Sequence, residues 1–138
     1  MRKKVARIFI LVVVMVLLLT TVAFAAMDAS EYIAATSAGI TRNGNTVNVN
    51  FYIIGATSMD QIGLKHIYLY EMNDNIWTLV KIFNYTDPLY AAALMDSNTY
   101  AKTGSVSYSG SAGKQYYASC WFYAEKNGGS DTITQSAY

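Results

Sequence analysis

Few residues in this sequence are of the types that attack a substrate or transfer a proton. His66 is the only histidine and Cys120 the only cysteine, so any cysteine–histidine pair must use both. By alternation, His66 falls on the outward face of one expected strand and Cys120 on the apolar face of another. Because the two side chains should then lie on opposite sides of a sheet, we expect a surface histidine and a buried thiol rather than a catalytic pair.

Carboxylates could supply the acid pair of a glycoside hydrolase or the ligands of a metal ion. The candidates for such a pair are Asp60, Glu71, Asp74 and Asp87. The two groups would have to face each other across a cleft, about 5–9.5 Å apart. All but Glu71 stand in turn-forming or irregular segments, where acids are common turn residues. No acidic cluster approaches the six or more oxygens that calcium requires. We therefore expect no catalytic residues, no metal and no cofactor.

The side chains present in excess are aromatic. Twelve tyrosines, two tryptophans and three phenylalanines follow residue 25, and a small core cannot hide them all. Five of these rings are expected on the outward face of one sheet: Tyr68, Tyr70, Tyr117, Trp121 and Tyr123. Flat rings on a rigid sheet suit burial against a protein partner or stacking on a sugar. Cross-strand aromatic pairs also stabilise a sheet by about 0.2–1 kcal/mol each, so a purely structural role stays open.

Alternation of apolar and polar residues predicts the strands that position these rings. The clearest run is 46–53, where Val47, Val49, Phe51 and Ile53 share one face. The expected strands cover residues 32–42, 46–53, 64–72, 77–83, 104–108, 116–124 and 132–137. Residues 84–98 are irregular and contain the single proline, so this segment could fold over the aromatic strip. Seven short strands in about 113 residues predict an all-β fold, a seven-stranded antiparallel β-sandwich occupying residues 26–138.

The first 25 residues have the three zones of a signal peptide. Arg2, Lys3, Lys4 and Arg7 precede an unbroken apolar run, residues 8–19, and Ala23-Phe24-Ala25 supplies a cleavage pattern. The competing interpretation is an uncleaved anchor, because the uncharged run continues to residue 27 and could just span a bilayer. We expect a cleaved signal peptide, residues 1–25, and a secreted or cell-surface protein whose only membrane segment is that signal.

The charge of the remaining chain argues against nucleic acid as a partner. After residue 25, six basic residues stand against nine acidic ones, a net charge of −3. Nucleic-acid binding requires clustered positive charge, and these lysines are scattered along the chain.

The strand order resembles that of an immunoglobulin or fibronectin type III domain. Tyr116 opens the sixth expected strand three residues after Gly113, and it resembles the tyrosine corner of such sandwiches. The paired cysteines of true immunoglobulin domains are absent, and Trp77 falls on the fourth strand.

Further stretches are similar to a family of small exported proteins of Gram-positive bacteria. They are Ala29-Ser30-Glu31-Tyr32-Ile33, Met59-Asp60-Gln61-Ile62-Gly63, Val106-Ser107-Tyr108-Ser109-Gly110, Phe122-Tyr123-Ala124 and Gly129-Ser130-Asp131. That family has no assigned function, so the resemblance implies export and a single domain, with no site residues. Together these observations predict a non-catalytic binding or structural domain. Its partner would be an extracellular protein recognised through the aromatic strip, or alternatively a polysaccharide or cell-wall glycan.

Overall fold

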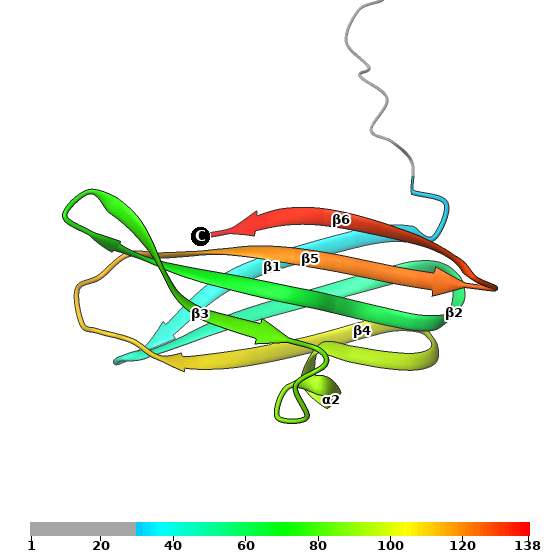
Figure 1. Cartoon of the computed structure of the whole chain (residues 1–138), viewed down its shortest axis with the longest axis horizontal. Coiled ribbons are helices and arrows are strands. Elements are labelled where there is room, and N and C mark those ends of the chain that lie inside the picture. Colours follow the sequence, from blue (N-terminus) through cyan, green and yellow to red (C-terminus); the bar gives the residue numbers. More distant parts are fainter. Residues whose placement is uncertain (1–29) are drawn as a thin grey trace, which may run out of the picture.

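A single long strand organises the fold. The computed structural model describes residues 30–138, and in it β2 (Thr46–Asn73) pairs with four other strands of one curled antiparallel sheet (Figure 1). The other strands are β1 (Ile33–Asn43), β3 (Ile76–Asn84), β4 (Met95–Ser109), β5 (Tyr116–Lys126) and β6 (Gly129–Ala137). One short helix, α2 (Ala91–Leu94), precedes β4. The predicted signal peptide lies outside the described residues.

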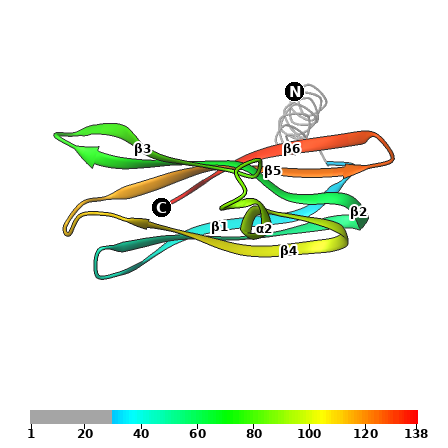
Figure 2. The same ribbon diagram turned by 60° about the horizontal axis from the view of Figure 1, so that its bottom comes forward.

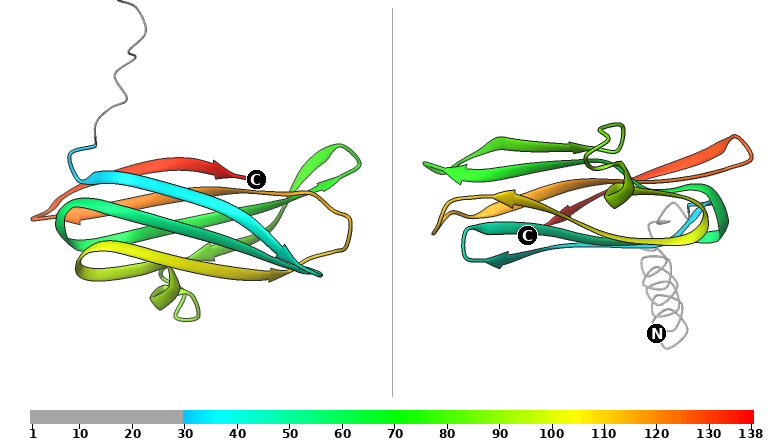
Figure 3. Two further views of the ribbon diagram at one scale, coloured as in Figure 1. Left: turned by 180° about the vertical axis from the view of Figure 1, so that it is seen from behind. Right: turned by 90° about the horizontal axis from the view of Figure 1, so that it is seen from below.

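β2 bends back on itself and so contributes to two layers. Its first arm, residues 46–54, lies between β1 and β4, and its second arm, residues 61–73, lies beside β5 and β3. Figure 3 (right) shows the two arms, teal and green, on opposite sides of the molecule. At the bend, Gly55 is buried where a Cβ would come within 2.9 Å of the Thr57 carbonyl oxygen, so only glycine fits there.

The all-β prediction is confirmed, but six strands replace the expected seven. The runs 46–53 and 64–72 are the two arms of the same strand. The residues between them, 54–63, were not assigned to any expected strand. Their backbone nevertheless stays in the ladder, because Met59 and Gln61 pair with β4, and Gln61 and Ile62 pair with β5. The immunoglobulin-like topology stays a prediction.

The core lies between the two layers, as the alternation predicted. On the first arm Val47, Val49 and Ile53 are fully buried, and on β5 the inward positions are Ala118, Cys120, Phe122 and Ala124. Phe51 and Phe122 meet edge to face across the layers, with ring centroids 6.3 Å apart. Each fully buried side chain of this size contributes about 1.5–3 kcal/mol, so packing alone supports a domain that has no disulfide among its described residues.

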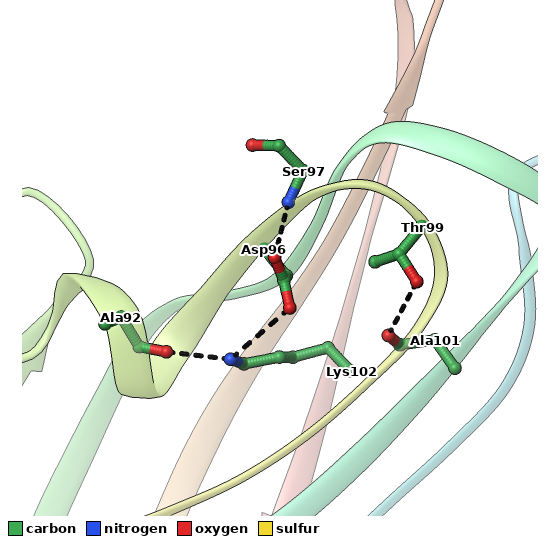
Figure 4. Close-up of polar contacts among 6 residues, drawn as sticks. All are labelled: Ala92, Asp96, Ser97, Thr99, Ala101 and Lys102. Carbon is green, nitrogen blue, oxygen red and sulfur yellow. Dashed lines mark hydrogen bonds and ion pairs between the residues drawn. The ribbon is translucent and has the colours of Figure 1, made fainter.

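The irregular segment 84–98 closes one edge of the core instead of covering the aromatic strip. The Tyr90 ring packs edge to face on buried Phe83 at 5.0 Å, and Leu94 of α2 is fully buried. Figure 2 shows α2 beside β4. There, Lys102 Nζ donates to the Ala92 carbonyl oxygen at 2.7 Å and lies 3.8 Å from Asp96 Oδ2 (Figure 4).

Two half-buried carboxylates hold the turn between β5 and β6 and the start of the described chain in place. Asp60 accepts the main-chain N–H of Asn127 at 2.8 Å and lies 3.1 Å from Lys126 Nζ. Asp131 accepts the Ser30 hydroxyl at 2.6 Å and the Tyr32 N–H at 3.2 Å. These hydrogen bonds hold the pKa of both carboxyl groups below the ordinary value of 3.8.

We therefore expect stability to fall as the solution is acidified below about pH 4. A carboxyl group whose pKa is lowered by folding stabilises the folded state above its unfolded pKa of 3.8, and that stabilisation is lost as pH falls through the lower folded pKa. Thermal melts between pH 6 and pH 2 measure this loss. The fall in melting temperature should be smaller in an Asp60→Asn/Asp131→Asn variant than in the unmodified protein. An equal fall in the two proteins would contradict the prediction.

Candidate functional site

Most of the expected rings lie on the outer face of the layer formed by β3, the second arm of β2, and β5. Tyr70 of β2 and Tyr117 of β5 stand directly opposite each other, and their rings are stacked at 4.6 Å with only 3° between their planes. Trp77 of β3 packs edge-on against Tyr117 at 4.8 Å. Burial raises the pKa of the Tyr117 hydroxyl, and the neighbouring tyrosines raise it further.

A second group of rings follows along the same face. His66, Tyr68 and Trp121 form a triangle in which the ring centroids lie 5.8–6.0 Å apart. Trp121 stands opposite His66 across the β2–β5 ladder, and a bulge at Lys65 sets this register. Edge-to-face packing of this kind holds the side chains in fixed positions before any partner arrives.

Aliphatic side chains of β3 complete the surface. Leu79 stands opposite Tyr70, and Ile82 stands opposite Tyr68. We call the resulting surface the aromatic face; its residues are Tyr68, Tyr70, Trp77, Leu79, Ile82, Tyr117 and Trp121. Four members on two strands, namely Trp77, Leu79, Ile82 and Trp121, are each 37–46% exposed. The seven side chains lie on three neighbouring strands, β3, β2 and β5, and none of them carries a charge.

Tyr123 was expected in this strip, but the structure buries it. Only 7% of the side chain is exposed, because Lys65 lies across the ring with Nζ 3.8 Å from its centroid. The hydroxyl donates to the Glu125 carboxylate at 2.5 Å. Burial, and then this hydrogen bond, raise the pKa of the Tyr123 hydroxyl. Lys65 reaches the ring from the β-bulge, an irregularity that alternation in the sequence does not reveal.

Three members of the aromatic face were not predicted from the sequence. Trp77, Leu79 and Ile82 belong to β3, where a register shift next to Val80 changes the alternation. Positions 77 and 79 therefore share a face with position 82 rather than with position 81. Alternation alone could have placed Trp77 and Leu79 on this face. Ile82 returns to the same face only because of the bulge.

At one end of the molecule, Tyr116 makes the contacts expected of a tyrosine corner. Its hydroxyl accepts the main-chain N–H of Ser111 at 2.8 Å and donates to the carboxylate of buried Glu71 at 2.5 Å. Burial, and then Glu71, raise the pKa of the Tyr116 hydroxyl. Arg42 lies over the ring at 5.3 Å and donates to the carbonyl oxygens of Lys114 and Ser111. The cluster therefore fastens the loop 110–115 to both layers.

The structure places the residues that the sequence offered for catalysis apart from one another. His66 packs among rings of the outer face, whereas Cys120 is buried in the core, and burial raises the pKa of its thiol to about 12. A thiol in that state is not a nucleophile at neutral pH. Of the four candidate carboxylates, Glu71 accepts the Tyr116 hydroxyl, and Asp60 accepts Lys126 Nζ and the Asn127 N–H. Asp87 accepts the Leu89 N–H, and Asp74 is exposed in the turn between β2 and β3. Within residues 30–138, no three histidine, cysteine or acidic side chains gather as metal ligands.

Comparison with protein-family models, curated proteins and solved structures gives no match for this chain. The resemblance to small exported proteins of Gram-positive bacteria therefore stays a prediction. Within residues 30–138, no helix is both long enough and apolar enough to cross a bilayer.

Proposed function

We propose that this protein is an exported, non-catalytic binding domain that recognises a protein partner through the aromatic face. The observation that carries the proposal is the exposure of Trp77, Leu79, Ile82 and Trp121 on one outer face, where β3 and β5 flank Tyr68 and Tyr70 of β2. Monomeric domains rarely present a contiguous apolar surface to water, and such surfaces commonly mark interaction sites. Export rests on the predicted signal peptide, and an immunoglobulin-like sandwich is the architecture we propose for the domain.

The composition of the aromatic face favours a protein partner over a sugar. Leu79 and Ile82 bury well against apolar side chains, but they offer a sugar neither a flat ring nor a hydrogen bond. The stacked pair Tyr70 and Tyr117 uses one face of each ring internally, and Trp121 is held edge-on by its neighbours. Tryptophan and tyrosine at the centre of a rigid patch are typical of protein hot spots.

Carbohydrate or cell-wall binding by the same rings is the alternative. It would depend mainly on Trp77 and Trp121, the two tryptophans of the surface. A protein partner would also depend on Leu79 and Ile82, so substitutions of the aliphatic pair distinguish the two functions.

The proposal predicts that a partner contacts the aromatic face and no other surface. A photoreactive amino acid replacing Ile82 should crosslink the secreted protein to one extracellular protein. The same photoreactive group in place of Leu89, which is exposed in the 84–90 turn, should form no such crosslink. With that partner purified, Trp121→Ala should weaken binding about 30-fold, the effect of losing a hot spot of ~2 kcal/mol.

The control for the affinity measurement is Tyr52→Ala. Tyr52 is 44% exposed, close to the value for Trp121, but it lies on the other layer of the molecule. Its substitution should leave binding of the protein partner unchanged. Equal weakening by the two variants, or none by a folded Trp121→Ala variant, would refute the role of the aromatic face.

A further inference from the structure

The opposite layer presents an outer face of different chemistry. On β1, the first arm of β2, and β4, the outward positions form rows across three strands: Thr41–Asn48–Ser107, Gly39–Asn50–Ser105 and Ser37–Tyr52–Thr103. We call these nine residues the polar face. Hydroxyl and amide groups dominate it, and Tyr52 is its only ring. Figure 3 (right) shows this layer on the side of the molecule away from β3.

A shallow hollow lies beside the Tyr52 ring. It has a volume of about 390 Å³ and is lined by Ser37, Ala38, Gly39, Asn50, Phe51, Tyr52 and Thr103. Gly39 borders free space, because a Cβ at that position would meet no atom within 4 Å. The lining therefore combines one exposed aromatic ring with hydroxyl and amide groups of three strands.

The amide group at the hollow is already oriented. Asn50 Nδ2 donates to the Thr41 hydroxyl at 2.9 Å, and Asn50 Oδ1 accepts the Ser105 hydroxyl at 2.9 Å. Each amide atom can make one further hydrogen bond, so Asn50 presents a fixed donor and a fixed acceptor. In the next row Ser107 donates to Asn48 at 2.7 Å, which orders a second amide. Preorganised polar groups lower the entropic cost of binding.

The charge of the lining selects the class of ligand. None of the seven lining residues is ionisable near neutral pH, so the hollow offers nothing to pair with a carboxylate, a phosphate or an ammonium group. This lining favours an uncharged ligand that offers hydroxyl groups to Ser37, Asn50 and Thr103 and one apolar face to the Tyr52 ring. Neutral sugars have these properties. We propose that the hollow beside Tyr52 binds a residue of a neutral polysaccharide chain.

This site is independent of the proposed protein-binding surface. Tyr52 stands on the first arm of β2, whereas Tyr68 and Tyr70 stand on the second arm in the other layer. A domain with both sites would hold a protein partner on one face and a glycan on the other. Failure of either site leaves the other unaffected, so the two proposals are tested separately.

Titration with neutral oligosaccharides, followed by NMR of isotopically labelled protein, tests the proposal. The probes are cellohexaose, chitohexaose, xylohexaose and mannohexaose at millimolar concentrations. At least one should shift the amide signals of Gly39, Asn50 and Tyr52 while leaving those of Tyr117 and Trp121 in place. Tyr52→Ala should weaken that binding at least tenfold.

A second variant blocks the hollow without removing a core side chain. Gly39 lies within β1, where valine is favoured, so Gly39→Val should keep the fold and place a branched side chain in the free space of the hollow. It should abolish binding, whereas Trp121→Ala should bind as the unmodified protein does. The proposal is overturned if no probe binds, if folded Gly39→Val binds unchanged, or if the shifted signals belong to the aromatic face.

Discussion

Replacing Gly63 by alanine should prevent the protein from folding stably. Gly63 has a φ of +156°, a conformation that residues with a side chain rarely adopt. A Cβ there would collide with the carbonyl oxygen of Leu94 and come within 2.9 Å of the Met95 Cα. Both contacts are backbone atoms, which cannot rotate away as the end of a flexible side chain can. We expect a loss of about 4 kcal/mol or more, seen in urea denaturation followed by circular dichroism.

Two other glycines provide matched controls for this prediction. Gly39→Ala adds a methyl group in open space within β1, so it should change stability by less than about 0.5 kcal/mol. A Cβ at Gly113 would also meet no atom, but the φ of this residue is +75°. Gly113→Ala should therefore lower the free energy of unfolding only through backbone strain, by about 1–2 kcal/mol. A Gly63→Ala variant no less stable than Gly113→Ala would show that β2 and the start of β4 do not approach as closely as described.

Removing the hydroxyl of Tyr116 should destabilise the protein far more than loss of one ordinary hydrogen bond. In Tyr116→Phe, the carboxylate of Glu71 loses its donor although only 9% of that residue is exposed. The N–H of Ser111 loses its acceptor as well. A charged group left buried without its partner costs more than a neutral pair, so we expect a loss of about 3 kcal/mol at pH 7. Denaturant titration measures it.

The double variant Glu71→Leu/Tyr116→Phe isolates the cause. If the unpaired carboxylate is responsible, replacing it by an apolar group should restore about half of the lost stability or more. Losses that simply add in the double variant would mean that the two side chains do not interact in solution. Tyr108→Phe is the matched control, since that half-buried tyrosine packs on the Tyr116 ring without a hydrogen bond to Glu71.

The bend of β2 explains how one strand supplies both proposed binding surfaces. The inward residues of its two arms face each other across the core, so the outward residues of the arms point in opposite directions. Tyr52 consequently belongs to the polar face, while Tyr68 and Tyr70 belong to the aromatic face. Gly55 and Gly63, near either end of the bend, permit the close contacts that this path requires.

Much of the candidate surface was predictable because strand alternation is a local property. Tyr68, Tyr70, Tyr117 and Trp121 lie on one outer face as expected, since each belongs to a stretch with unbroken period two. Tyr123 also follows the alternation, but Lys65 covers it from a bulge in the neighbouring strand. Trp77 and Leu79 follow unbroken alternation and could have been assigned, whereas Ile82 returns to the same face only because a bulge at Val80 shifts the alternation within β3.

By itself, the sequence determined the all-β class, most strand positions and the inward residues of the core. These features depend on backbone geometry and on the side chains of one or two neighbouring segments. Only the tertiary structure decided that two expected strands are arms of one, that segment 84–98 seals the core edge, and that Tyr123 is covered. Bulges, bends and the covering of one side chain by another arise from contacts between residues far apart in the chain. The alternation within a single strand therefore does not reveal them.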